Sequence, residues 1–243
     1  MMVWGSFGAV HIASLLIGVG LLVGLYFLLR RFSAKTQTVV LGVLSFSGIA
    51  AIIFNLVTWG SPLEYLPLHL CSLTAMVLPF AVFTRSKVLG NLLLLWSLGA
   101  VMALVVNTAQ ANFELCSATF AFYYFPHLLE FGIPILLIAL GLVEKDVKCI
   151  GSTLLITVGA LIPIHLTNVL LNTYCAAHQL LNPAGELIQV NYMYTIQPAN
   201  PLLDLFWSLI PHPFWYLMPV VVIVLVYLAA VYCKEIFARL KKK

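Results

Sequence analysis

Seven apolar runs of about 20 residues are the feature that most constrains this chain. A run of this length crosses the hydrocarbon core of a bilayer as a helix, whereas the strands of a membrane barrel are about ten residues long and alternate in polarity. Lipid offers the backbone no hydrogen-bond partners, so only helices and closed barrels span it. The sequence therefore predicts an all-α polytopic membrane protein, one domain of seven transmembrane helices. The expected spans are residues 7–29, 38–59, 66–84, 88–107, 120–142, 150–172 and 214–233.

Composition supports this class. Only 8% of the 243 residues are charged and 63% are hydrophobic, whereas a soluble domain carries roughly a quarter charged residues. The first run has no basic segment before it and no small-residue cleavage site after it, and Arg30 and Arg31 follow directly. We therefore expect an uncleaved span instead of a signal peptide.

The charges indicate the orientation. Seven helices place every Lys and Arg in loops on one side, and the loops on the other side contain acidic residues without Lys or Arg. By the positive-inside rule the amino terminus is outside and the carboxyl terminus is cytoplasmic. The formal net charge of +4 accordingly reflects topology and contact with anionic lipid, and we expect no nucleic-acid partner.

Polar side chains within the predicted spans gather at one depth. Counting along the helices places His127 and His165 about 10 Å below the outer surface and Cys71 about 7 Å below it. Since ionisable residues within a span usually face the bundle interior or a wet cavity, we expect an outward-facing pocket. The outer halves of the spans also contain Glu130, Asn107, Asn168 and Asn172.

Helical spacing groups these residues further. His127 and Glu130 are three residues apart and share a face, as do His165, Asn168 and Asn172. The alternative is that they form hydrogen bonds between helices that only hold the bundle together. We favour this alternative for any single asparagine, and we favour function for His127 with Glu130.

Cys71 follows Pro67, a residue suited to the first turn of a helix. The positive end of a helix favours a thiolate, which is a strong nucleophile toward acyl carbonyls. On a regular helix His69 points about 200° away from Cys71, so His127 and His165 are the candidates for its base unless this turn is irregular. The alternative is that Cys71 is a small packing residue.

Two features belong to the outer loops. Cys116 and Cys175 lie in different outer loops, and a disulfide between them would join these two loops. Residues 173–213 form the one long connection, and it is too apolar and aromatic to be disordered. We interpret it as a lid over the pocket, with a short interfacial helix that begins at Pro201.

Three blocks resemble a known family: YLPLHLCSL at residues 65–73, FPHLLEFGIPILLI at 125–138, and NYMYTIQPANPLLDLFWSLIPHPFWYL at 191–217. They resemble the YwaF-like integral membrane proteins, which include bacterial members and the vertebrate transmembrane protein 164. The resemblance implies lipid acyl transfer through Cys71, with His69 and His127 as functional neighbours. It also implies that Asn191 and Tyr192 line the pocket.

The leading hypothesis is therefore a lipid acyltransferase without a cofactor, in which Cys71 is the nucleophile, a histidine is its base and Glu130 orients that histidine. Its partners would be membrane lipids, and its location a bacterial plasma membrane with the site on the extracytoplasmic side. One alternative is a zinc-dependent membrane hydrolase with His69, His127 and His165 as ligands. Another is a lipid-binding protein or transporter without enzymatic activity.

Overall fold

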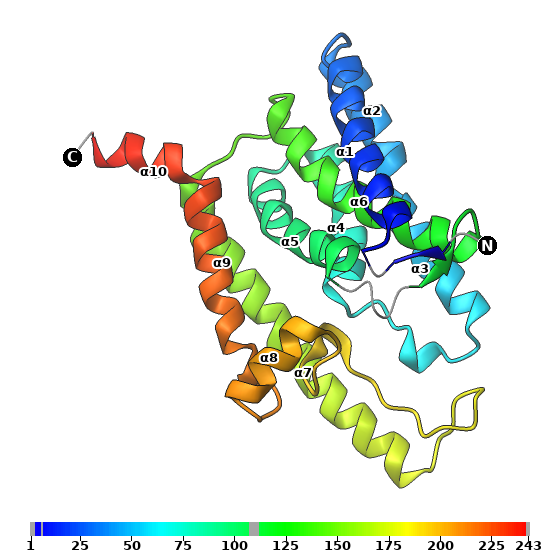
Figure 1. Cartoon of the computed structure of the whole chain (residues 1–243). Coiled ribbons are helices and arrows are strands. Elements are labelled where there is room, and N and C mark those ends of the chain that lie inside the picture. The colour runs from blue at the N-terminus through cyan, green and yellow to red at the C-terminus, as the bar shows by residue number, and fades with distance from the viewer. Residues whose placement is uncertain (1–2, 6, 107–111, 242–243) are drawn as a thin grey trace.

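The apolar runs fold into helices in the computed structural model, which describes residues 3–5, 7–106 and 112–241. Figure 1 shows their arrangement. A two-stranded antiparallel sheet of β1 (Val3–Trp4) and β2 (Phe113–Glu114) joins the start of the chain to the segment before α6. The helices are α1 (Ala9–Leu29), α2 (Ala34–Ser45), α3 (Ser47–Thr58), α4 (Leu70–Thr84), α5 (Lys87–Val105), α6 (Ala118–Ala139), α7 (Ile150–Ala177), α8 (Pro201–Leu209), α9 (Met218–Val231) and α10 (Cys233–Leu240).

Every predicted span coincides with a helix, and five helical segments among the described residues are long and apolar enough to cross a membrane. The chain is thus a mainly helical integral membrane protein, as the all-α prediction requires apart from the short sheet of β1 and β2. The two remaining predicted spans correspond to the shorter apolar helices Leu70–Thr84 and Trp215–Val231. Seven crossings and their orientation therefore remain a prediction. The five long segments are Ala9–Leu29, Ala34–Thr58, Lys87–Val105, Ala118–Ala139 and Val147–Ala177.

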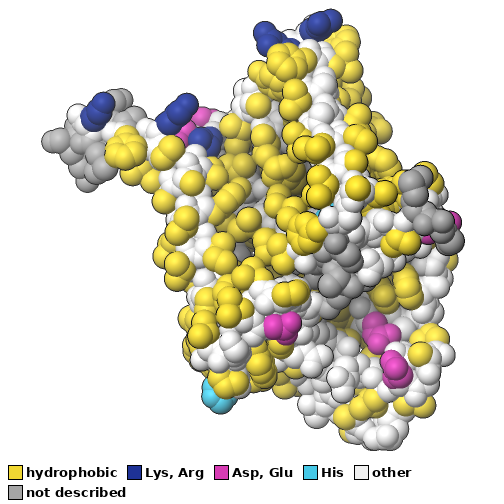
Figure 2. Space-filling view, viewed as in Figure 1, with side chains coloured by type: hydrophobic (Ala, Val, Ile, Leu, Met, Phe, Trp, Pro, Cys, Tyr) yellow, Lys and Arg dark blue, Asp and Glu magenta, His cyan; other side chains and the backbone are white. Residues whose placement is uncertain are grey.

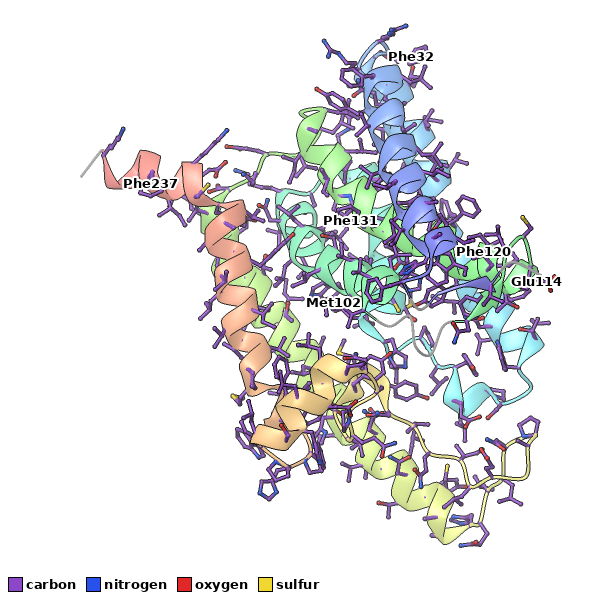
Figure 3. All side chains as sticks on the ribbon, viewed as in Figure 1. Phe32, Met102, Glu114, Phe120, Phe131 and Phe237 are labelled. Carbon is purple, nitrogen blue, oxygen red and sulfur yellow. The ribbon has the colours of Figure 1, made fainter. Side chains whose placement is uncertain are left out.

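Helix α5 lies at the centre of the bundle, where it packs against α4, α6 and α7. Its Leu93 is fully buried and Trp96 is 4% exposed. The Trp96 indole donates a hydrogen bond to Thr157 Oγ1 of α7 at 2.9 Å, and the Tyr227 hydroxyl of α9 donates to the Leu94 carbonyl at 2.6 Å. Buried leucines and these polar contacts together fix α7 and α9 against α5. Figure 3 shows the side chains that fill the space between the helices.

Basic residues meet at one end of the helices. We call it the basic end and define it by Arg85, Lys87 and Arg239, together with Asp146, which pairs with two of them. Asp146 accepts from Lys87 at 3.2 Å and pairs with Arg239 of α10 at 3.2 Å. Arg85 donates to Thr38 Oγ1 of α2 at 2.7 Å. These contacts join the start of α2, the α4–α5 turn, the α6–α7 loop and α10. Figure 2 shows Lys and Arg at this end and most visible Asp and Glu away from it.

Asn91 organises the backbone just inside the basic end. Its side chain is 1% exposed, and its Nδ2 donates to the carbonyls of Lys87 and Glu144 at 2.8 and 2.9 Å. Its Oδ1 accepts from the Asp146 N–H at 3.0 Å and from the Tyr232 hydroxyl at 2.6 Å. One amide therefore satisfies groups from α5, from the α6–α7 loop and from the end of α9.

Helix α4 begins later than predicted. Its first residue is Leu70, and His69 is the N-cap with an extended backbone at φ −75°, ψ 156°. Pro67 thus lies outside the helix, and the prediction that it stands in the first turn is wrong. Pro67 restricts Leu66, the residue before it, to extended conformations, which favours a later start. Cys71 consequently lies in the first turn of α4, and the side chain of His69 is not held at helical spacing from it.

The long connection between α7 and α9 also differs in its bounds. Helix α7 continues to Ala177, past the expected end at residue 172. A turn and an isolated bridge between Leu181 and Leu187 follow. The expected helix at Pro201 is α8, and the Asn200 side chain caps it by accepting from the Leu203 N–H at 3.0 Å.

Candidate functional site

His127 has a defined tautomer. Its Nδ1 lies 2.6 Å from the Tyr123 carbonyl one turn earlier on α6, and a carbonyl can only accept, so Nδ1 carries the hydrogen. The Nε2 of the neutral ring is then an acceptor, as a general base requires, and it has no hydrogen-bond partner among the described residues. The Tyr123 ring lies against the imidazole with centroids 4.5 Å apart. The group that orients His127 is therefore the Tyr123 carbonyl. The sequence predicted Glu130 for this role.

Glu130 is an acidic group buried within α6. It is 3% exposed, and its Oε2 has no hydrogen-bond partner among the described residues. It interacts electrostatically with His127 and with Cys71. Burying a polar group without a partner is unfavourable, so the presence of Glu130 at this position indicates a role beyond packing.

Gly48 of α3 makes room for this carboxyl group. A Cβ atom added there would lie 2.5 Å from the Cβ of Ala75 and 2.8 Å from Oε1 of Glu130. Ala75 is one turn after Cys71 on the same face of α4. The close approach of α3, α4 and α6 at Gly48 therefore brings Glu130 to the face of α4 that carries Cys71.

Cys71 is a free, half-buried thiol. It interacts electrostatically with Tyr123 and Glu130, which joins it to the cluster on α6. Among the described residues, its sulfur makes no hydrogen bond to a histidine. Such contacts often tighten only when substrate is bound. We call Cys71, Tyr123, His127 and Glu130 the α4–α6 cluster.

His69 lies two residues before Cys71, where it contacts the lid and lines a hollow. Its Nδ1 accepts from the Met193 N–H at 3.3 Å, and its ring packs on Tyr192 and Tyr194 with centroids 5.6 and 5.4 Å away. The same side chain lines a hollow of about 640 Å³. The other residues lining this hollow are Trp59, Glu64, Tyr65, Asn182, Pro183, Ala184 and Gln189.

The polar stripe on α7 shares one face, as predicted, and it holds the lid. His165 Nδ1 lies 3.0 Å from Thr195 Oγ1. Asn168 donates to the Tyr192 carbonyl at 2.8 Å and accepts from the Tyr192 N–H at 2.9 Å. Asn172 forms the same pair of bonds with Val190, at 2.9 and 2.7 Å. In this structure the stripe therefore forms structural hydrogen bonds, which was the alternative to a pocket role in the sequence analysis.

Two further residues expected in the pocket also stabilise the lid. Asn191 closes a turn, since it accepts from the Ile196 N–H at 3.0 Å and donates to the Gln197 carbonyl at 2.8 Å. Tyr192 is 1% exposed and its hydroxyl donates to the Leu63 carbonyl. Burial raises the pKa of the Tyr192 phenol to about 12, so it stays a neutral donor. Asn107, the remaining residue expected there, lies outside the described residues.

The zinc alternative lacks a ligand set. In the part of the chain that the structure describes, no three His, Cys, Asp or Glu side chains come together as metal ligands. The three histidines proposed for it instead bind different partners: His69 contacts Met193, His127 contacts Tyr123, and His165 contacts Thr195.

The expected disulfide is absent from the structure. Cys116 and Cys175 are both free thiols; Cys116 is exposed, whereas Cys175 is fully buried. Because α7 continues through Ala177, Cys175 is a helical residue that packs among apolar side chains, including Ile188 and Val190 of the lid. It is therefore a core residue in this structure and not part of a flexible loop.

Sequence reasoning missed three residues of this region. Tyr123 precedes His127 by four residues, a spacing that indicates contact on a helix. Thr195 follows the NYMY block directly, and its hydroxyl accepts from Asn168 at 2.8 Å. Gly48 had no comparable signal, because its importance depends on helices distant in the sequence.

Together these features define a class: an integral membrane protein with a cysteine, a histidine and a buried carboxyl group gathered where α4 meets α6. Comparison with known proteins identifies the family. The TMEM164 family matches residues 6–232, nearly the whole chain, and the chain belongs to this family. No curated protein and no solved structure matches it.

Proposed function

We propose that the protein is a lipid acyltransferase that works through an acyl-enzyme on Cys71. The observation that supports this most is the α4–α6 cluster, in which a thiol on α4 is grouped with an imidazole and a buried carboxyl group on α6. Among the described residues, neither Nε2 of this imidazole nor Oε2 of this carboxyl group has a hydrogen-bond partner. Acyl transfer through cysteine needs a nucleophile, a base and a group that orients the base, which here are Cys71, His127 and the Tyr123 carbonyl.

The reaction has two balanced halves. Cys71 Sγ attacks the ester carbonyl carbon of a donor lipid while His127 Nε2 takes the thiol proton. The carbon–oxygen bond of the ester then breaks, and the departing lysolipid oxygen receives that proton, which leaves a thioester on Cys71. In the second half the hydroxyl group of an acceptor lysolipid gives its proton to His127 and attacks the thioester. Cys71 leaves as a thiolate and is reprotonated by His127.

Glu130 supports this cycle electrostatically. When ionised, its carboxyl group would stabilise the imidazolium that appears when His127 holds the proton, because the two groups share one face of α6. The low dielectric around a residue that is 3% exposed would strengthen this interaction relative to water.

The proposal includes an orientation. With seven crossings, the basic end faces the cytoplasm and the α4–α6 cluster opens toward the extracytoplasmic leaflet of a bacterial plasma membrane. The contacts that join four chain segments at the basic end support a common cytoplasmic side. Lipid would reach the cluster from the outer half of the bilayer, under the lid.

Intact-mass analysis tests the mechanism. The purified protein, incubated with phosphatidylcholine vesicles and a lysolipid acceptor, should gain one acyl mass that maps to Cys71. Cys71→Ala and Cys71→Ser should fold normally, lack the adduct and lose at least about 100-fold in turnover. The matched control is Cys233→Ala, which removes an exposed thiol at the basic end and should leave turnover unchanged. Full turnover by Cys71→Ala would exclude the covalent mechanism.

A further inference from the structure

The lid contains a strained turn at residues 192–194. Met193 and Tyr194 both adopt left-handed backbone conformations, with φ of 51° and 54°, which are unfavourable for any residue with a Cβ atom. Such strain persists only where the surroundings over-determine it, and it is concentrated at functional sites. Two consecutive strained residues therefore indicate a function for this turn.

The turn is held from both sides. Asn168 bonds to both backbone polar groups of Tyr192, at 2.8 and 2.9 Å. The Tyr216 hydroxyl donates to the Tyr194 carbonyl, and the Phe214 N–H donates to the Thr195 carbonyl at 2.7 Å. Contacts from α7 and from the start of the last apolar helix thus fix the turn. Between these fixed points lies Met193, whose N–H points at His69.

This contact determines where His69 holds its proton. A backbone N–H can only donate, so Nδ1 of His69 must be an unprotonated acceptor. The neutral ring therefore carries its hydrogen on Nε2. His127 has the opposite tautomer, because the Tyr123 carbonyl requires the hydrogen on Nδ1. One imidazole presents a donor at Nε2 and the other presents an acceptor.

We propose, building on the acyl transfer proposed for Cys71, that the two histidines have separate roles: His127 moves the proton, and His69 donates its Nε2–H to the oxyanion that forms on the substrate carbonyl. The turn at 192–194 is then a positioning element that sets the tautomer of His69. His69 is the N-cap of α4, two residues before Cys71, and it lines the hollow. It is thus adjacent to the nucleophile in the chain and accessible from the hollow, through which an ester would approach.

The chemistry favours this division. Attack by Sγ converts the ester carbonyl oxygen into an oxyanion, which needs a fixed donor and no proton transfer. A single donor of this kind contributes about 10²–10³-fold to kcat. His69 would keep its proton throughout the cycle, since the Met193 N–H disfavours a hydrogen on Nδ1. All proton movement then passes through Nε2 of His127.

Substitutions at both positions separate the roles. In His69→Gln the side-chain amide reaches about as far as Nε2 and can donate, so kcat should fall by less than about 10-fold. His69→Ala lacks the donor, and kcat should fall by about 10²–10³-fold with little change in KM. His127→Gln keeps a polar group but cannot accept a proton, so kcat should fall by about 10²–10⁴-fold. His212→Gln alters an exposed histidine and is the matched control.

Nitrogen-15 NMR of histidine-labelled protein in lipid nanodiscs reports the tautomers independently of activity. The signals absent from His69→Gln and His127→Gln assign the two rings. His69 should show a protonated Nε2 and His127 a protonated Nδ1. Asn168→Ala releases the backbone of Tyr192 from α7 and loosens the turn, so it should shift the His69 signals, with the Cys71 adduct retained at a lower rate.

The outcomes distinguish the two proposals. A Cys71 adduct in the wild type, with equal kcat for His69→Gln and His69→Ala, would overturn the donor role of His69 and leave acyl transfer intact. A protonated Nδ1 on His69 would also overturn it. A wild type that transfers no acyl group and forms no adduct would overturn the proposed function, and the oxyanion role with it.

Discussion

At the scale of single residues, polar side chains determine how this apolar chain is organised. Asn91 satisfies two carbonyls, one N–H and one hydroxyl from three segments. Asn168 likewise satisfies the carbonyl and the N–H of Tyr192 in the lid. Because buried polar groups are costly when left unpaired, such residues fix one arrangement of the helices and exclude others. Glu130 differs, since its Oε2 is buried without a partner among the described residues.

Asn91→Ala should therefore destabilise the protein strongly. The change leaves the Asp146 N–H, the Tyr232 hydroxyl and two carbonyls without their partner, and we expect a loss of about 2–4 kcal/mol in the free energy of unfolding. Tyr232→Phe removes only one of the four bonds and should cost about 1 kcal/mol. Unfolding in detergent, followed by circular dichroism, measures both. Equal stabilities for the two variants would contradict the central role of Asn91.

At the scale of elements, one close approach of helices creates the candidate site. Helices α3, α4 and α6 meet at Gly48, where no side chain separates Ala75 from the Glu130 carboxyl group. Helix α2 leads from the basic end to this point, and a break at Phe46 separates it from α3. The geometry of the α4–α6 cluster thus depends on a residue that takes no part in its chemistry.

Gly48→Ala tests this dependence. The added methyl group would meet Ala75 Cβ at 2.5 Å and Glu130 Oε1 at 2.8 Å, so we expect α3 to be displaced at a cost of about 1–3 kcal/mol. Gly20→Ala on α1 is the control, because nothing lies within 4 Å of its added Cβ; its stability should change by less than about 1 kcal/mol. Acyl transfer should fall in Gly48→Ala alone. Unchanged stability and activity there would show that the contact is not needed.

At the scale of the whole molecule, the charges define two ends. The contacts of Asp146 and Arg85 gather the basic segments, whereas the lid and the N-terminal sheet lie toward the other end (Figure 1). Phe237 is 65% exposed and lies on α10 at one edge of the molecule (Figure 3). This helix combines an apolar side chain with basic neighbours, which is typical of a helix lying on an anionic membrane surface.

Two exposed native cysteines test the orientation. Cys116 precedes α6, and Cys233 begins α10 at the basic end. A membrane-impermeant maleimide should label Cys116 in intact cells without prior reduction. It should label Cys233 only after the membrane is permeabilised. The opposite pattern would reverse the proposed orientation, and labelling of Cys116 only after reduction would restore the expected disulfide.

The sequence predicts this architecture well and the site in part. Length and apolarity of the runs place the helices, because lipid leaves the backbone few choices, and helical spacing groups His127 with Glu130 and the residues of the α7 stripe. The roles are harder to predict. Whether Asn168 faces a substrate or a backbone depends on the path of a lid 24 residues later. The orienting partner of His127 is a backbone carbonyl, which every residue possesses, so no residue type reveals it.

The late start of α4 has a consequence for the bilayer itself. A helix of 15 residues is about 22 Å long, which is shorter than the hydrocarbon layer of about 30 Å. Such mismatch is relieved by local thinning, so headgroups and water sink toward the short helix. Lipid linkages would then descend to the level of the first turn of α4, where the thiol lies. The membrane would thus deliver its own glycerol esters to the enzyme without any molecule having to leave the leaflet.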